Sequence, residues 1–218
     1  MEMNVKDFKV LVAQPVAPNG NLNMWRSNCE KIFESLTFEN KVHGLYCDKV
    51  SGEGAKFARH ARVRNNLLDQ FLDDSITHVL WFDADVVEWP KDIIEKIFEI
   101  STSEVVAPYV FIEDNEWWPF KRFYDISCFR DLDGNEFDYK PPFYNSKNGD
   151  VTSEVSCVGT VFMVPADLHR KFSYDPYFES NEHIFFFNKV IDSGRKVIAT
   201  PEIEVRHAFL PKYGENFH

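Results

Sequence analysis

The chain has 218 residues, of which 44% are hydrophobic and 27% are charged, with 21 Phe, 8 Tyr and 5 Trp. This length and composition predict a globular protein with a sizeable core, and they exclude a disordered chain. The formal net charge of −11 argues against a large basic surface for duplex nucleic acid or for an anionic membrane.

The four cysteines are widely spaced and form no C-x-x-C pair. This spacing argues against a structural zinc site and against a small disulfide scaffold, and it favours a reducing compartment. The first nine residues are too acidic, and the apolar run after them too short, for a signal peptide. Because no run approaches 18 apolar residues, we expect no membrane span and a soluble, cytoplasmic protein.

Strands and helices alternate in the first half of the chain. Hydrophobic patterning predicts strands at residues 10–13, 43–47, 77–82 and 105–112, and helices at residues 23–36, 55–72 and 91–100. Between the first strand and helix, residues 14–20 contain two prolines and a glycine, which predicts an open loop. The alternation is typical of an α/β fold with an open, mainly parallel sheet flanked by helices.

The second half of the chain has a different character. Residues 113–150 are aromatic and polar, with several prolines, and indicate irregular structure or an antiparallel insert. An apolar segment is expected at residues 155–164, and helices are expected at residues 166–171 and 184–193. Two short closing strands are expected at residues 197–199 and 203–207. No repeat or linker divides the chain, so residues 1–218 are expected to form a single domain.

The most informative motif is the acidic pair Asp83 and Asp85, which follows the most apolar strand of the chain. Ligands of open α/β sheets bind at the carboxyl ends of the strands. Strand alternation would let both side chains point the same way, and carboxylates suit Mg²⁺ or Mn²⁺, which in turn can carry a diphosphate. The plainer interpretation is that these residues end a strand and cap the next helix.

With this pair, the sequence resembles the GT-A glycosyltransferases, whose D-x-D motif holds a divalent metal on the diphosphate of a nucleotide sugar. Further similarities are Arg64-Asn65 upstream of the pair, as in family 2-like enzymes, and Gly159 followed by Ala166-Asp167 and His169-Arg170, as in the fungal mannan-polymerase type. Glu182-His183 stands at the position of the Glu-Asp motif of family 2-like enzymes. The resemblance covers about residues 8–210, and the size is similar to single-domain glycosyltransferases of large algal viruses.

The resemblance implies a metal-dependent transfer of a sugar from a UDP- or GDP-sugar to a glycan or glycoprotein acceptor. Residues 8–112 would form the nucleotide-binding half, and residues 113–210 the acceptor and catalytic half. Asp85 would bind Mn²⁺ or Mg²⁺, and Asp83 would either share the ion or receive a ribose hydroxyl. His207 would be a third ligand, although a histidine at a strand end is often only hydrogen-bonded.

Other side chains receive roles around this expected metal. Arg62 and Arg64 could contact the diphosphate, because guanidinium groups donate paired hydrogen bonds to phosphate, or they could lie on a solvated helix face. Gln14 and Pro15, which follow the first strand, are placed by topology to meet the base and ribose, or they belong to an ordinary loop.

The catalytic and acceptor residues are expected in the second half of the chain. Glu182 is the expected general base, unless it is only a favourable carboxylate at a helix N-terminus. His183 stands where the family often has Asp, which leaves inversion or retention at the anomeric carbon open. Trp117 and Trp118 could stack on an acceptor sugar or belong to the core.

Two rival functions remain. A sugar-1-phosphate nucleotidyltransferase would need a glycine-rich, basic loop after the first strand, whereas residues 14–18 contain no basic residue. A non-catalytic carbohydrate- or cation-binding domain of the same fold would bind without turnover.

Overall fold

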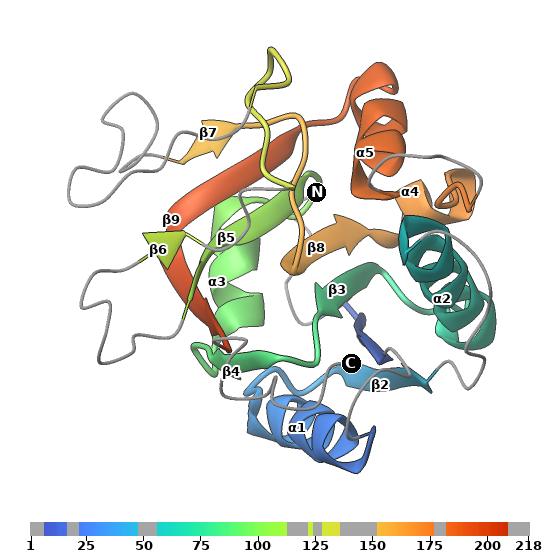
Figure 1. Cartoon of the computed structure of the whole chain (residues 1–218), viewed down its shortest axis with the longest axis vertical. Coiled ribbons are helices and arrows are strands. Elements are labelled where there is room, and N and C mark those ends of the chain that lie inside the picture. Colours follow the sequence, from blue (N-terminus) through green and yellow to red (C-terminus); the bar gives the residue numbers. More distant parts are fainter. Residues whose placement is uncertain are drawn as a thin grey trace.

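The computed structural model describes residues 7–16, 22–47, 56–112, 122–123, 128–135, 152–176 and 182–208. In this part of the chain, nine strands form one mixed sheet, whose main path has the order β2-β1-β3-β8-β5-β9-β4 (Figure 1). The strands are β1 (Val10–Val16), β2 (Lys41–Cys47), β3 (His78–Phe82), β4 (Val86–Glu88), β5 (Val105–Ile112), β6 (Arg122–Phe123), β7 (Ser153–Glu154), β8 (Val161–Pro165) and β9 (Val197–His207).

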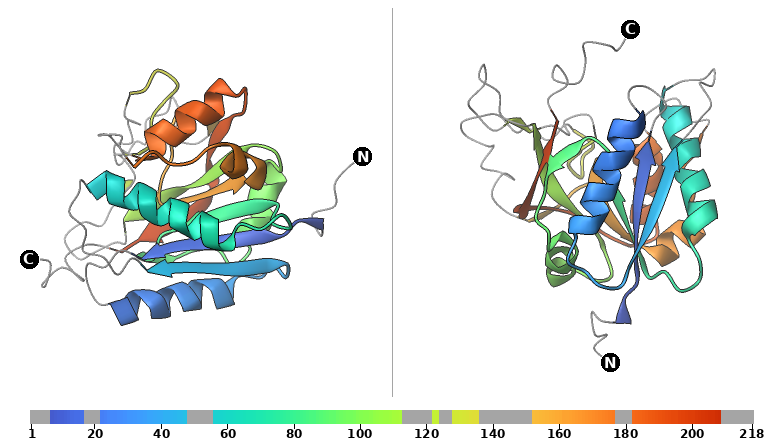
Figure 2. Two further views of the ribbon diagram at one scale, coloured as in Figure 1. Left: turned by 90° about the vertical axis from the view of Figure 1, so that its right-hand side faces the viewer. Right: turned by 90° about the horizontal axis from the view of Figure 1, so that it is seen from below.

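Five helices cover the two faces of this sheet. They are α1 (Leu22–Ser35), α2 (Lys56–Phe71), α3 (Ile93–Ile100), α4 (Ala166–Lys171) and α5 (Glu182–Asp192). Helices α2, α4 and α5 lie on one face, and α1 and α3 lie on the other (Figure 2). Among the described residues, no helix combines the length and the apolar character needed to cross a membrane.

Period-two alternation along the strands builds a separate core on each face. In β3, Val79 and Trp81 pack into the core under α2, α4 and α5, whereas Leu80 and Phe82 pack into the core under α1 and α3. All five β3 residues are buried, and the strand lies between β1 and β8 near the middle of the sheet. The expected central strand is therefore confirmed.

The sheet is mixed because one inner strand, β8, runs against its two neighbours. Strand β1 runs parallel to both β2 and β3, which confirms the expected parallel arrangement of the first half. Strand β8 is antiparallel to both β3 and β5, whereas β9 runs parallel to β5 and therefore in the direction of β1 to β3. The carboxyl ends of β1, β2 and β3 meet at one edge, where the acidic pair follows β3.

Three details differ from the sequence prediction. Strand β1 continues through Gln14 and Pro15 to Val16, so these residues lie in a strand and not in a loop. The proline is tolerated because β3 pairs with β1 only as far as Ala13, which leaves β2 as the one paired neighbour beyond that point. The two expected closing strands are one eleven-residue strand, β9, with an irregular register, and the short strand β4 was not predicted.

Candidate functional site

The acidic pair lies in a tight turn. Strand β3 ends at Phe82, and the backbone N–H of Val86 then donates to the carbonyl of Asp83 at 3.4 Å. We call the four residues from Asp83 to Val86 the acidic turn. The expectation that strand alternation aligns the two carboxylates is wrong, because the chain leaves the extended conformation after Phe82.

A side chain from α1 supports the acidic turn. The amide nitrogen of Asn28 donates to the carbonyl oxygen of Ala84 at 2.6 Å and to that of Val86 at 2.9 Å. Ala84 itself packs into a small apolar cluster with Val16 and Cys29. Asn28 therefore holds the backbone on both sides of Asp85.

Backbone contacts hold the same turn from two further segments. The N–H of Asp83 donates to the carbonyl of Thr160 at 3.1 Å, and the N–H of Ala208 donates to the carbonyl of Asp85 at 2.9 Å. Thr160 has φ = 56°, a left-handed conformation that is a genuine outlier for a β-branched residue. The acidic turn is thus positioned by segments that are distant in the sequence.

Asp85 contacts His207 at the end of β9. The Nε2 atom of His207 lies 2.9 Å from Oδ1 of Asp85, and its Nδ1 atom donates to the carbonyl of Ala208 at 2.8 Å. Burial alone would lower the pKa of His207, but the Asp85 carboxylate raises it. When Nδ1 carries the proton, the Nε2 atom of a neutral imidazole is an acceptor, and it faces a carboxylate oxygen that is also an acceptor. A second proton, bound to Nε2, turns this contact into a hydrogen bond.

These two residues fit a divalent metal by chemistry and by spacing. A metal-binding histidine commonly donates its other N–H to a backbone carbonyl, as His207 does. Oxygen ligands lie about 2.0–2.1 Å from Mg²⁺, and neighbouring octahedral ligands are therefore about 3 Å apart, which is close to the 2.9 Å contact of Asp85 and His207. Within the described ranges, however, no group of three His, Cys, Asp or Glu side chains is arranged to hold an ion.

Asp83 contacts a different partner. Its Oδ1 atom lies 3.5 Å from an Nη2 atom of Arg64, which projects from α2. The Arg64 side chain is only 5% exposed, and its guanidinium carbon lies 4.7 Å from the ring centre of Trp81. Burial would lower the pKa of Arg64, but the carboxylates of Asp83 and Glu182 raise it, so the guanidinium stays charged.

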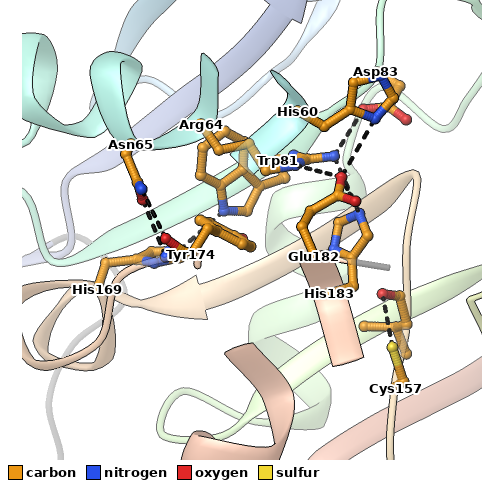
Figure 3. A network of polar contacts seen from close by, with 11 residues as sticks. His60, Arg64, Asn65, Trp81, Asp83, Cys157, His169, Tyr174, Glu182 and His183 are labelled. Carbon is orange, nitrogen blue, oxygen red and sulfur yellow. Dashed lines mark hydrogen bonds and ion pairs between the residues drawn. The ribbon is translucent and has the colours of Figure 1, made fainter. Parts of the chain in front are cut away.

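Glu182 lies beneath this pair, at the first position of α5. Its Oε1 atom is 3.7 Å from Nε of Arg64, 3.4 Å from Nδ1 of His60 and 3.5 Å from Nε2 of His183 (Figure 3). The Nη2 atom of Arg64, which contacts Asp83, also lies 3.3 Å from Nε2 of His183. We call His60, Arg64, Asp83, Glu182 and His183 together the Arg64 cluster.

The electrostatics of the Arg64 cluster follow from burial. Desolvation raises the pKa of Asp83 to about 6 against the opposing charge of Arg64, and Asp85 adds a smaller rise. Burial and then Arg64 lower the pKa of His183 to about 3, so its imidazole is neutral and can accept from Arg64. Burial would raise the pKa of Glu182, but His183, His60 and Arg64 around its carboxylate lower it to about 2. At neutral pH, the Arg64 guanidinium therefore faces two carboxylates.

The remaining predicted site residues are placed less favourably. Gln14 is fully buried, and its carboxamide oxygen lies 2.7 Å from Nε2 of His43, so it does not face solvent at the sheet edge. Two residues turn an α-helix by about 200°, so Arg62 lies on the side of α2 opposite the buried Arg64. Arg62 is therefore exposed. Trp117 and Trp118 lie outside the described residues.

Several residues of the family-like motifs have structural roles. Asn65 exchanges two hydrogen bonds with the backbone of Tyr174, at 2.8 and 3.0 Å, and so ties α2 to the segment after α4. His169 is buried and accepts from the indole N–H of Trp81 at 2.9 Å. Arg170 donates to the carbonyls of Asp73 and Ile76, both at 2.8 Å.

His60 and Asn28 were missed by the sequence analysis. His60 lies four residues before Arg64 on α2, a spacing that places both on one helix face and that could have identified it. No comparable signal marks Asn28, because its partners are 56 and 58 residues away along the chain.

Comparisons with known proteins agree with this architecture. The Anp1 family model matches residues 47–138, which include α2 and the acidic turn. No curated protein matches the sequence.

Similar solved structures include Staphylococcus aureus TarS in complex with UDP (TM-score 0.56, 11% identity), which aligns with 94% of this chain and 62% of its own. They also include GalNAc-T7 with UDP, GalNAc and Mn²⁺ (TM-score 0.57, 13% identity), which aligns with 92% of this chain and 43% of its own. The chain therefore has the GT-A fold of these two structures and spans less than two thirds of either chain.

Proposed function

We propose that this chain is a metal-dependent glycosyltransferase that moves a sugar from a UDP- or GDP-sugar to a glycan or glycoprotein acceptor. The observation that carries the proposal is the acidic turn at the end of the central strand of a GT-A fold, with Asp85 against His207 and Asp83 against Arg64. The partial match to the Anp1 family and the similar structures with bound UDP support it.

In this proposal, Asp85 and His207 are the residues that would hold Mn²⁺ or Mg²⁺. The bound ion would neutralise charge that develops on the leaving diphosphate. Asp83 contacts Arg64, which favours a hydroxyl of the donor as its partner over the ion. Glu182 and His183, which both contact Arg64, belong to the catalytic centre.

Several further residues are proposed to contact the donor or the acceptor. Arg64 is buried and fixed by its contacts, so it supplies a permanent positive charge behind Asp83. Arg62, Gln14 and Pro15 remain proposed donor contacts; Arg62 is exposed, Pro15 is half-buried and Gln14 is buried. Trp117 and Trp118 remain proposed acceptor contacts.

The test is to incubate the purified chain with Mn²⁺ and a panel of UDP- and GDP-sugars, with and without candidate acceptors, and to measure free nucleoside diphosphate. We expect release with one donor, and loss of that release in Asp85→Asn. Glu88→Gln is the matched control, because Glu88 is a carboxylate of the neighbouring strand β4 whose side chain is 69% exposed. Release of pyrophosphate instead would indicate a nucleotidyltransferase, and no release with any donor would indicate a binding domain.

A further inference from the structure

The Arg64 cluster has a buried side and a side that faces solvent. The side chains of Glu182, Arg64 and His183 are 3%, 5% and 5% exposed, whereas those of His60 and Asp83 are 33% and 29% exposed. A substrate that approaches the cluster therefore meets His60 and Asp83 first. A general base must come within hydrogen-bond reach of the proton that it takes, and the Glu182 carboxylate is covered by its three neighbours.

The contact with Glu182 orients the imidazole of His60. A carboxylate can only accept, so the 3.4 Å contact of Oε1 with Nδ1 favours the tautomer that carries its proton on Nδ1. The Nε2 atom then keeps its lone pair, and among the described residues no partner for it is found. A histidine held in this way by a carboxylate is suited to accept a proton at Nε2.

The Arg64 cluster places a carboxylate directly against the ring of His60. The guanidinium of Arg64 faces the carboxylates of Asp83 and Glu182, while His183 is neutral. Asp83 is less suited to accept a proton, because its carboxylate already contacts Arg64.

We infer that His60 is the catalytic residue that accepts the proton of the attacking hydroxyl, and that Glu182 is the positioning residue that orients it. This inference rests on the proposed function. In the step, the acceptor oxygen forms a bond to the anomeric carbon, and its proton passes to Nε2 of His60. The bond from the anomeric carbon to the phosphate oxygen breaks, and its electron pair leaves with the nucleoside diphosphate.

The test uses His60→Asn in the full chain. The asparagine amide can donate to Glu182 as the Nδ1–H group does, but it cannot take a proton. With the donor found in the panel, at saturating concentration with Mn²⁺, we expect the release of nucleoside diphosphate to slow by about 100-fold or more. The Kd for UDP or GDP with Mn²⁺, measured by titration calorimetry, should change by less than about 2-fold, since a base contributes little to nucleotide binding.

Two further variants complete the design. His60→Gln is the second variant, with the same expected loss, should His60→Asn not fold, and Asp69→Asn, an exposed position on the same helix, should keep wild-type turnover. The role of Glu182 is read from Glu182→Gln, for which we expect a lower kcat with the nucleotide Kd retained.

The outcomes separate the inference from the proposed function. An active wild-type chain with a His60→Asn variant that keeps more than a tenth of its turnover would overturn the inference alone. Nucleotide binding that weakens as much as turnover falls would instead make His60 a donor contact and would also overturn it. A wild-type chain that releases no nucleoside diphosphate from any donor would overturn both.

Discussion

Asp83 and Asp85 are one residue apart, yet they contact regions of opposite character. Asp83 faces the buried Arg64 cluster between α2 and α5, where three of the five side chains are at most 5% exposed. Asp85 is 34% exposed and faces His207 at the edge between β4 and β9. The comparison indicates that the buried region supplies fixed charge and rigidity, whereas the exposed edge carries the two residues that we propose to hold a metal ion.

The largest expected effect is on the buried region. Arg64→Met would leave the Glu182 carboxylate without its cation, and breaking a buried ion pair in this way typically costs about 3–5 kcal/mol of unfolding free energy. Urea denaturation followed by circular dichroism measures this loss. Arg62→Met, on the exposed side of the same helix, should change stability by less than about 0.5 kcal/mol. A loss below about 1 kcal/mol for Arg64→Met would show that the cluster does not stabilise the fold.

At the edge, the expected effect is on binding and not on stability. Asp85→Asn should weaken Mn²⁺-dependent binding of UDP or GDP by about 10–100-fold or more, since even residues outside the ligand set can cost that much. The unfolding free energy should stay within about 1 kcal/mol, because Asp85 is partly exposed. Titration calorimetry with and without Mn²⁺ measures the binding, with Glu88→Gln as the control. Equal Mn²⁺ dependence in the wild type and in Asp85→Asn would remove Asp85 from the metal site.

The buried region should also make stability depend on pH through His169. Burial and then Arg64 lower its pKa from 6.5 to about 3, so the unfolded chain binds this proton at a higher pH than the folded chain. The contribution of neutral His169 to the unfolding free energy is therefore complete above pH 6.5 and is lost as the pH falls toward 3.

Between pH 7 and pH 5, this contribution amounts to about 2 kcal/mol. His169→Gln keeps an acceptor for the indole N–H of Trp81 and removes the titration. We expect the unfolding free energy of the wild type to fall more steeply over this range than that of the variant. Parallel pH profiles of the two proteins would contradict the assignment.

The smallest expected effect concerns the support of the acidic turn. Asn28→Ala removes two hydrogen bonds to partly buried carbonyls, which water can replace in part, so we expect a loss of about 1 kcal/mol. The metal affinity should fall as well, because the backbone on both sides of Asp85 is released. Ser27→Ala, at the exposed neighbouring position, should leave both quantities unchanged. Unchanged Mn²⁺ affinity in Asn28→Ala would show that the turn holds its shape without this support.

Much of the fold could be predicted from local patterns. The buried run at residues 78–82 and the periodic apolar residues of α3 identify their elements directly, because burial selects the same spacing that the pattern shows. The continuation of β1 through Pro15 could not be predicted in this way. It depends on where β3 stops pairing with β1, which is a property of the assembled sheet.

For the candidate site, the sequence by itself determined the acidic pair, because charged groups after an apolar strand stand out in one dimension, and the resemblance to GT-A enzymes added Arg64, Glu182, His183 and His207. Only the tertiary structure decided that Asp83 and Asp85 separate toward different partners, that Glu182 is covered, and that His60 reaches the surface. The physical reason is that exposure and electrostatic partners depend on contacts across the chain, such as the 119 residues between Arg64 and His183, which no local pattern encodes.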